Sequence, residues 1–130
     1  MYCLDTNIIV DILRGDRLLA EKVDNTFEKG FDIFITPISL CELYRGAYGH
    51  QNSAKKVEEL NAFIFNLRII GFDIESCKEF GKEYSRLNKI GKQTKEFDLL
   101  IACIVKVNEL ILVTRDKKDF ENIDVNIEVW

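Results

Sequence analysis

The chain has 130 residues, of which 47% are hydrophobic and 31% are charged. This balance is typical of one folded domain with a sizeable core, and we expect a single domain over residues 1–130. The sequence has one proline and no low-complexity tract, which excludes collagen-like and linker-like classes. Its net charge of −4 excludes a surface that is cationic throughout and binds nucleic acid by bulk charge.

No apolar run approaches the roughly 18 residues of a membrane span, and the first residues lack the basic segment of a signal peptide. We therefore expect a cytoplasmic protein without a membrane segment. Cys3, Cys41, Cys77 and Cys103 lie far apart in apolar stretches, so we expect four reduced, buried cysteines. His50 is the only histidine, which excludes a histidine-based zinc site and a Ser-His-Asp triad.

Hydrophobic periodicity predicts strands that alternate with pairs of helices. Apolar and β-branched runs predict strands at residues 1–4, 31–35, 68–72, 110–114 and 125–130. Apolar residues at helical spacing predict helices at 7–13, 16–29, 36–49, 53–67, 75–90 and 97–107. In the fifth helix the predicted apolar face consists of Cys77, Phe80, Tyr84 and Leu87. The order indicates an α/β fold, a three-layer α/β/α sandwich with a central, mainly parallel sheet.

Four acids fall near the edge where such a sheet binds ligands, beyond the carboxyl ends of its strands. Asp5 directly follows the first predicted strand, and Asp116 follows the fourth. Glu42 and Asp98 each lie within a strongly apolar helical stretch, where a buried carboxylate is costly unless it is paired or binds a metal.

Each acid taken alone also has a purely structural explanation. Asp5 and Asp98 can cap the helices that begin beside them. Asp116 can stabilise a turn through its side chain, and Glu42 can face solvent or pair with Arg45. The combination favours a functional site, because four acids at separate junctions converge on one edge of the predicted sheet.

Clustered carboxylates repel one another, and their pKa values rise unless a cation is present. Oxygen ligands without histidine or cysteine suit Mg²⁺ or Mn²⁺. Such ions bind phosphate oxygens and can activate water for phosphodiester hydrolysis. Thr6, Asn7 and Thr114 stand beside the acids and can orient them or contact phosphate, or they can serve as local caps.

Four blocks of the sequence resemble the PIN-domain ribonucleases of the VapC toxin type. The blocks are LDTN at 4–7, CELYRG at 41–46, FDLLIA at 97–102 and VTRDKKDF at 113–120. They occur in the order typical of the family and span almost the whole chain. The resemblance implies a PIN fold and a divalent-metal-dependent endoribonuclease.

The resemblance also implies an acidic quartet that holds Mg²⁺ or Mn²⁺. Its members are Asp5, Glu42, Asp98 and Asp116. Relatives often have asparagine at the position of Asp116, and Asp119 is a nearby acid that can share its role. Thr114 matches a hydroxyl position beside the metal. Cys103 stands where a small alanine is common, and we expect it to affect packing only.

The partners implied by the resemblance are an RNA substrate, with tRNA as one candidate, a second copy of the chain, and an inhibitory VapB-like antitoxin. Arg45 and Arg115 flank the acids and can bind RNA phosphate or pair with neighbouring carboxylates. We expect four phenylalanines to lie in the core rather than to stack on bases: Phe27, Phe63, Phe80 and Phe97.

Two other interpretations belong to different classes. A phosphotransferase of the haloacid dehalogenase type also has an aspartate after its first strand, but it needs a second acid two residues later, where Asn7 stands. A catalytically silent PIN-like binding module, or a housekeeping nuclease outside a toxin–antitoxin system, would keep the same fold. Metal-dependent RNA cleavage and growth arrest on expression separate these alternatives.

Overall fold

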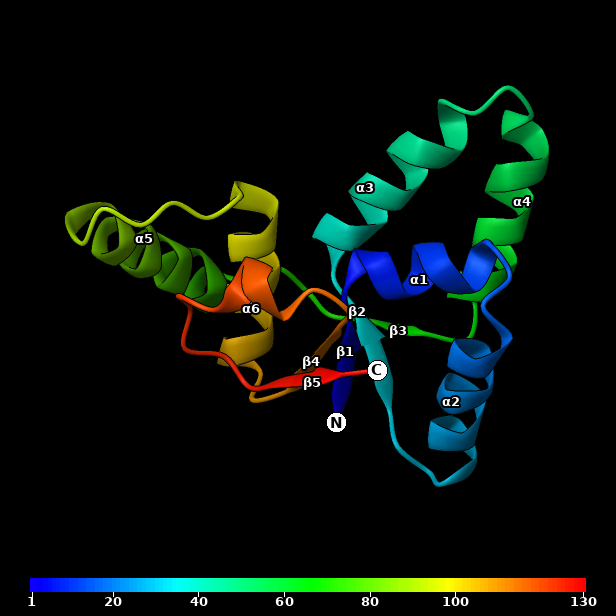
Figure 1. Ribbon diagram of the computed structural model, residues 1–130, viewed down its shortest axis with the longest axis horizontal. Coiled ribbons are helices and arrows are strands. Elements are labelled where there is room, and N and C mark those ends of the chain that lie inside the picture. Colours follow the sequence, from blue (N-terminus) through cyan, green and yellow to red (C-terminus); the bar gives the residue numbers. More distant parts are fainter.

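The chain alternates strands and helices as the sequence predicts, and the computed structural model describes residues 1–130 (Figure 1). The strands are β1 (Tyr2–Leu4), β2 (Ile33–Ile35), β3 (Arg68–Ile69), β4 (Ile111–Thr114) and β5 (Ile127–Val129). The helices are α1 (Thr6–Leu13), α2 (Arg17–Glu28), α3 (Pro37–Tyr48), α4 (Ser53–Ile64), α5 (Ile74–Lys89), α6 (Glu96–Val107) and the short 3₁₀ helix η1 (Lys117–Phe120). None of the helices combines the length and the apolar character that a membrane span requires.

All five strands are parallel and lie in the order β3-β2-β1-β4-β5. Tyr2 of β1 is in register with Ile33 on one side and with Ile111 on the other. The chain first builds the sheet outward from β1 to β3 and then crosses to the opposite side of β1 at β4. The direction of connection therefore reverses between β1 and β4, which is where open parallel sheets bind ligands.

Two hydrophobic cores form the layers of the sandwich, because successive side chains of a strand point to opposite faces. Cys3 and Leu112 pack into the core beneath α5 and α6. Leu4 and Val113, the next residue of each strand, pack into the core with residues of α1 to α4. Figure 1 shows α5 and α6 on one side of the strands and α1 to α4 on the other. The predicted three-layer fold is confirmed.

The buried face of α5 differs from the predicted one. Ser76, Glu83 and Leu87 are buried, whereas Tyr84 is 46% exposed. A buried glutamate is possible because its carboxylate contacts the guanidinium of Arg86 at 2.6 Å, and that cation lowers the pKa of Glu83. The Nζ atom of Lys106 on α6 lies 3.9 Å from the same carboxylate. This ion-pair network allows a polar side chain to lie in the α5–α6 contact, while Phe80 and Leu87 of the predicted face still pack against the core.

The expectation of four buried cysteines is wrong for two of them. All four are free thiols, but only Cys3 and Cys103 are buried. Cys41 and Cys77 are exposed, because each lies on an amphipathic helix just off its buried face. On α3 that face includes Leu43, which is 6% exposed, and an apolar stretch of sequence therefore overstates how many of its residues reach the core.

Candidate functional site

An open pocket of about 370 Å³ lies beyond the carboxyl end of β1. Its lining includes five acids from separate parts of the chain: Asp5, Asp11, Glu42, Asp98 and Asp119. Thr6, Asn7, Arg14 and Lys95 complete most of its polar surface. Figure 1 shows the start of α1 next to the start of α3, the helix that carries Glu42, and both lie near the ends of the strands. We call this cavity the acidic pocket.

The acidic pocket brings together three of the acids singled out in the sequence. Asp5 follows β1, Glu42 lies on α3, and Asp98 lies in the first turn of α6. The other two acids of the lining are Asp11 on α1 and Asp119 on η1, whereas Asp116 is exposed and does not line the pocket. Asp119 lies within η1, which is anchored by Phe120, a side chain that is 1% exposed in the core beneath α5 and α6.

Asp5 is 4% exposed and both of its carboxylate oxygens accept hydrogen bonds. It is the N-cap of α1, and its Oδ1 accepts from the backbone N–H of Thr6 at 2.8 Å. Its Oδ2 accepts from the hydroxyl of Thr114 at 2.8 Å. That hydroxyl in turn accepts from the side-chain amide of Asn7 at 3.3 Å and from the backbone N–H of Asp116 at 3.1 Å. The end of β4 thus fixes the orientation of the carboxylate at the end of β1.

A chain of hydroxyl groups fixes Glu42. The Thr6 hydroxyl donates to Oε1 of Glu42 at 2.8 Å and lies 3.0 Å from the hydroxyl of Ser39. Ser39 lies 3.4 Å from the hydroxyl of Thr36, which caps α3 by accepting from the Ser39 N–H at 3.1 Å. A hydroxyl has one proton to donate, so the consistent direction runs from Thr36 through Ser39 and Thr6 to the carboxylate. Both Thr36 and Ser39 are fully buried.

The acids of the pocket disfavour one another's charged forms. Burial raises the pKa of Asp5, and the charges of Glu42 and Asp119 raise it further, against the two hydrogen bonds that lower it. Burial raises the pKa of Asp98 to about 7, and the charges of Asp5, Asp119 and Glu42 add to the effect. Burial also raises the pKa of Asp119, followed by the charge of Asp116. The pocket therefore favours the binding of positive charge.

The cations near the acidic pocket are divided between two roles. Arg115 forms ion pairs with Asp11 at 3.2 Å and with Asp16 at 2.7 Å. Of the two roles that the sequence leaves open for Arg115, pairing with neighbouring carboxylates is therefore the one observed. Lys95, at the start of α6, lines the pocket, and its charge opposes the rise in the pKa of Asp98. Arg14 lines the pocket from the end of α1.

The donors suit a hard divalent cation because the pocket contains carboxylate and hydroxyl oxygens and no histidine or cysteine. No three acidic, cysteine or histidine side chains lie close enough together to enclose a metal ion. Magnesium does not require such an enclosure, since it is usually held by one or two carboxylates and keeps several waters.

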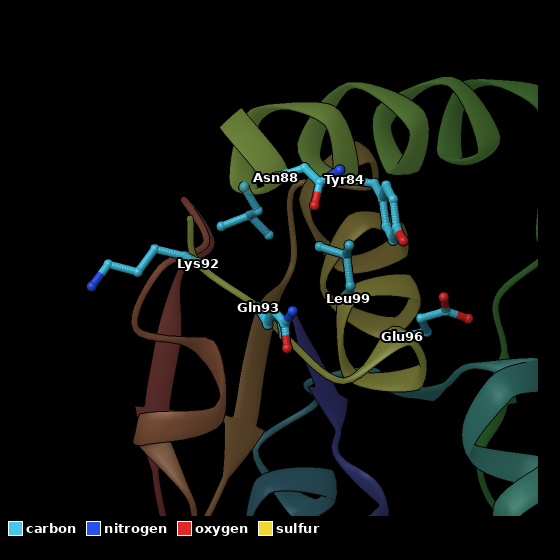
Figure 2. A pocket seen from close by; sticks show the side chains of 8 residues that line it. Tyr84, Asn88, Lys92, Gln93, Glu96 and Leu99 are labelled. Carbon is cyan, nitrogen blue, oxygen red and sulfur yellow. The ribbon is translucent and has the colours of Figure 1, made fainter. Parts of the chain in front are cut away.

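A second pocket, of about 210 Å³, lies between the end of α5, the 90–95 segment and the start of α6 (Figure 2). Tyr84 and Asn88 line it from α5, and Leu99 lines it from α6. Lys92 extends away from the other labelled side chains. Glu96 is its only acid, so this pocket lacks the clustered carboxylates of the acidic pocket.

Sequence reasoning missed five polar residues of the site: Asp11, Arg14, Thr36, Ser39 and Lys95. A signal for Ser39 does exist, because it precedes Glu42 by three residues on a helix and so lies on the same side. For Arg14 and Lys95 no comparable signal exists, since isolated basic residues at helix ends are usually solvated.

The hydroxyl chain predicts that Ser39 stabilises the fold through its hydrogen bonds. We expect Ser39→Ala to lower the free energy of unfolding by about 1–3 kcal/mol, because it leaves buried hydroxyl partners unsatisfied. Ser76→Ala is the matched control, since Ser76 is also fully buried but its hydroxyl has no hydrogen-bond partner. Urea unfolding of the three proteins measures the difference, and equal stabilities for the two variants would contradict the prediction.

The raised pKa of Asp98 predicts a pH-dependent stability in the absence of divalent metal. Its folded pKa of about 7 exceeds its unfolded value of about 3.9, so its stabilising contribution is complete below pH 4 and is lost as the pH rises through 7. Asparagine stays neutral, so in EDTA we expect Asp98→Asn to gain about 1–2 kcal/mol over wild type at pH 8, after allowance for solvent screening.

The same comparison at pH 4 should give little difference. Thermal and urea unfolding across this range measure it, with the exposed Asp24→Asn as the control for loss of one negative charge. If the stability gained by Asp98→Asn over wild type does not grow between pH 4 and pH 8, then the pKa of Asp98 is not raised in the folded protein and the prediction is wrong.

Comparison with known proteins places this geometry in a family. Residues 2–126 match the PIN domain family. The chain is 27% identical to Ribonuclease VapC1 of Haemophilus influenzae strain R2866 over 132 residues, which cover 100% of this chain and 98% of that protein. It is 31% identical to Ribonuclease VapC1 of Methanocaldococcus jannaschii over 120 residues, which cover 92% of this chain and 79% of that protein.

The fold agrees with the sequence matches. A chain in the crystal structure of VapBC2 from Rickettsia felis, bound to a DNA fragment from its promoter, superposes on this protein with a TM-score of 0.93. The two chains are 27% identical, and the superposition covers 99% of this chain and 98% of the other. The chain therefore belongs to the PIN-domain family, and within it to the ribonucleases of the VapC type.

Proposed function

We propose that the protein is a divalent-metal-dependent endoribonuclease that hydrolyses RNA phosphodiester bonds and acts as the toxin of a toxin–antitoxin pair. The observation that carries the proposal is the set of four acids, Asp5, Glu42, Asp98 and Asp119, in one pocket at the switch point of a parallel sheet. The names of the ribonuclease relatives support the reaction class.

The metal ligands in this proposal are drawn from these four acids, with Mg²⁺ or Mn²⁺ as the ion. Asp5 and Asp98 are the proposed main ligands, as the family resemblance implies, and a cation would favour the charged form of each against its raised pKa. Asp119 takes the fourth position in preference to Asp116, since Asp119 lines the pocket and Asp116 adjoins it. A bound ion would polarise an attacking water and neutralise charge on the phosphate.

The chain's own residues orient this chemistry. The Thr114 hydroxyl and the Thr6 N–H hold the two oxygens of Asp5, and the Thr6 hydroxyl holds one oxygen of Glu42, so each carboxylate has a fixed orientation. Lys95 and Arg14 provide positive charge on the pocket wall, where they can contact the phosphate of the substrate. Asp98, with a pKa of about 7, is ionised only in part at neutral pH until a cation binds.

A VapB-like antitoxin is the proposed inhibitor, supported by the VapBC complex that contains the similar Rickettsia felis chain. An acidic pocket of this kind can be blocked by a basic side chain of such a partner, because the carboxylates favour any cation that reaches them. Homodimerisation and a cytoplasmic location, both implied by the family resemblance, belong to the same proposal.

Cleavage of RNA should depend on a divalent ion and on the acids of the pocket. We expect the protein to cleave mixed tRNA with Mg²⁺ or Mn²⁺ and to lose cleavage in EDTA. The cleavage rate of Asp5→Asn and of Asp119→Asn should fall by more than the roughly 10–100-fold that is typical when a group that only supports a metal ligand is removed. The cleavage rate of Asp116→Asn should fall by less. Gel analysis of product against time, with Asp24→Asn as the control, measures the rates.

Two results would overturn parts of this assignment. Equal cleavage with and without EDTA would contradict metal dependence. Absence of cleavage under every metal condition, by a protein whose circular dichroism shows it to be folded, would favour a catalytically silent binding module. A larger loss in Asp116→Asn than in Asp119→Asn would exchange the roles of these two acids.

The toxin assignment predicts an effect on cells that cleavage alone does not. We expect induced expression of the wild-type chain in a bacterial host to stop growth, and expression of Asp5→Asn to leave growth unchanged because the same fold lacks a central carboxylate. Co-expression of a VapB-like protein encoded beside the toxin gene should restore growth. Normal growth of cells that contain active enzyme would favour a housekeeping nuclease.

A further inference from the structure

One exposed aromatic side chain directly precedes an acid of the acidic pocket in the sequence. Phe97 directly precedes Asp98 on α6 and is 41% exposed, so the expectation that it lies in the core is wrong. The other three phenylalanines considered with it do pack against the two cores: Phe27, Phe63 and Phe80. Phe97 therefore differs from them in having a ring that is open to solvent next to an acid of the site.

A guanidinium group lies over this ring. The central carbon of the Arg45 guanidinium is 5.9 Å from the centroid of the Phe97 ring, which is within the range of a cation–π contact. Arg45 lies on α3, three residues after Glu42, and it makes no ion pair. The contact therefore joins the helix that carries Glu42 to the helix that carries Asp98.

Proteins that bind single-stranded RNA commonly combine an aromatic surface with positive charge. Unpaired bases are bound by stacking on aromatic rings and on the planes of arginine side chains, while phosphates require positive charge. With a net charge of −4, this chain cannot bind RNA by bulk charge, and Arg115 is already paired with two carboxylates. Arg45 makes no ion pair, so its guanidinium can contact a phosphate or a base. The partly exposed ring of Phe97, over which it lies, offers a planar apolar surface.

We propose that Phe97 and Arg45 form a stacking site for one unpaired nucleobase of the RNA strand, adjacent to the phosphate bound at the acidic pocket. In this site the base stacks on the ring of Phe97, and Arg45 leaves the ring to contact the base plane or the neighbouring phosphate. The proposal rests on the proposed function because it takes RNA as the substrate. Stacking tolerates any base, so the site contributes affinity and position rather than sequence preference.

The test uses ten-nucleotide single-stranded RNA probes of uridine in which one position at a time carries 2-aminopurine, whose fluorescence is quenched by stacking. Titration is performed with Ca²⁺ in place of Mg²⁺, and probe integrity is checked by gel after each titration. With wild-type protein we expect quenching at one or two adjacent positions of the probe. Phe97→Leu should abolish that quenching and weaken binding by about 5-fold or more, whereas Phe97→Trp should retain both.

Phe72→Leu is the matched control, since Phe72 is 40% exposed but lies in the segment before α5, and it should bind the probe as wild type does. Arg45→Gln should weaken binding while the bound probe remains quenched. Equal binding and quenching by Phe97→Leu and wild type would overturn the proposal, as would absence of quenching with the wild-type protein.

A change in the size-exclusion mass of Phe97→Leu would also overturn the proposal, because it would assign the ring to an interface between copies of the chain. The stacking site and the nuclease assignment fail separately. If the probe is quenched but tRNA is not cleaved in Mg²⁺, the nuclease assignment is wrong and the stacking site is supported. If tRNA is cleaved but Phe97→Leu binds the probe as wild type does, the stacking site is wrong and the nuclease assignment is supported.

Discussion

Repulsion between carboxylates at one edge of the sheet is the constraint on which the site depends. Parallel strands place their carboxyl ends together, and the reversal of connections between β1 and β4 leaves space there for a ligand. The chain fills this space with acids from α1, α3, α6 and η1. Without a counter-charge this arrangement is unfavourable, since the pKa values of Asp5, Asp98 and Asp119 all rise above their ordinary range. A positive charge in this pocket would relieve the repulsion between the acids.

The neighbouring residues hold the acids without cancelling their charge. Neutral hydroxyls from Thr6 and Thr114 contact the carboxylates of Glu42 and Asp5, and Arg115 is turned aside into ion pairs with Asp11 and Asp16. An arginine bound directly to Asp5 would lower the pKa of that acid but would also occupy the position that a divalent ion needs. Buried hydroxyl groups fix geometry at a lower electrostatic cost, and this explains why fully buried polar side chains lie at the strand ends.

The sequence predicts the fold well because its signals are local and repeated. Alternation within β1 and β4 separates the two cores, and the position of Asp5 after β1 follows directly from the strand boundary. Among the predictions that differ from the structure, the buried face of α5 and the fourth acid both depend on tertiary contacts that hydrophobic spacing does not reveal. Glu83 is buried because it pairs with Arg86 on the same helix and with Lys106 on α6. The choice between Asp116 and Asp119 depends on how η1 is anchored, and this is decided by the packing of its neighbour in the core.

Under the proposed function, substrate and metal would have to assist one another in a pocket of this charge. RNA brings negative phosphates to acids that already repel, so its approach is unfavourable until a divalent cation has reversed the local sign of the potential. A cation held there would accept phosphate oxygens as further ligands, which would compensate for the lack of three converging protein side chains. Lys95 and Arg14 line the pocket from two helices, and together they reduce this barrier only in part, because the acids of the lining outnumber them. Under the proposed function, affinity for RNA would therefore also come from contacts outside the pocket, and the exposed ring of Phe97, which precedes Asp98, provides an apolar surface on which such a contact would not depend on charge.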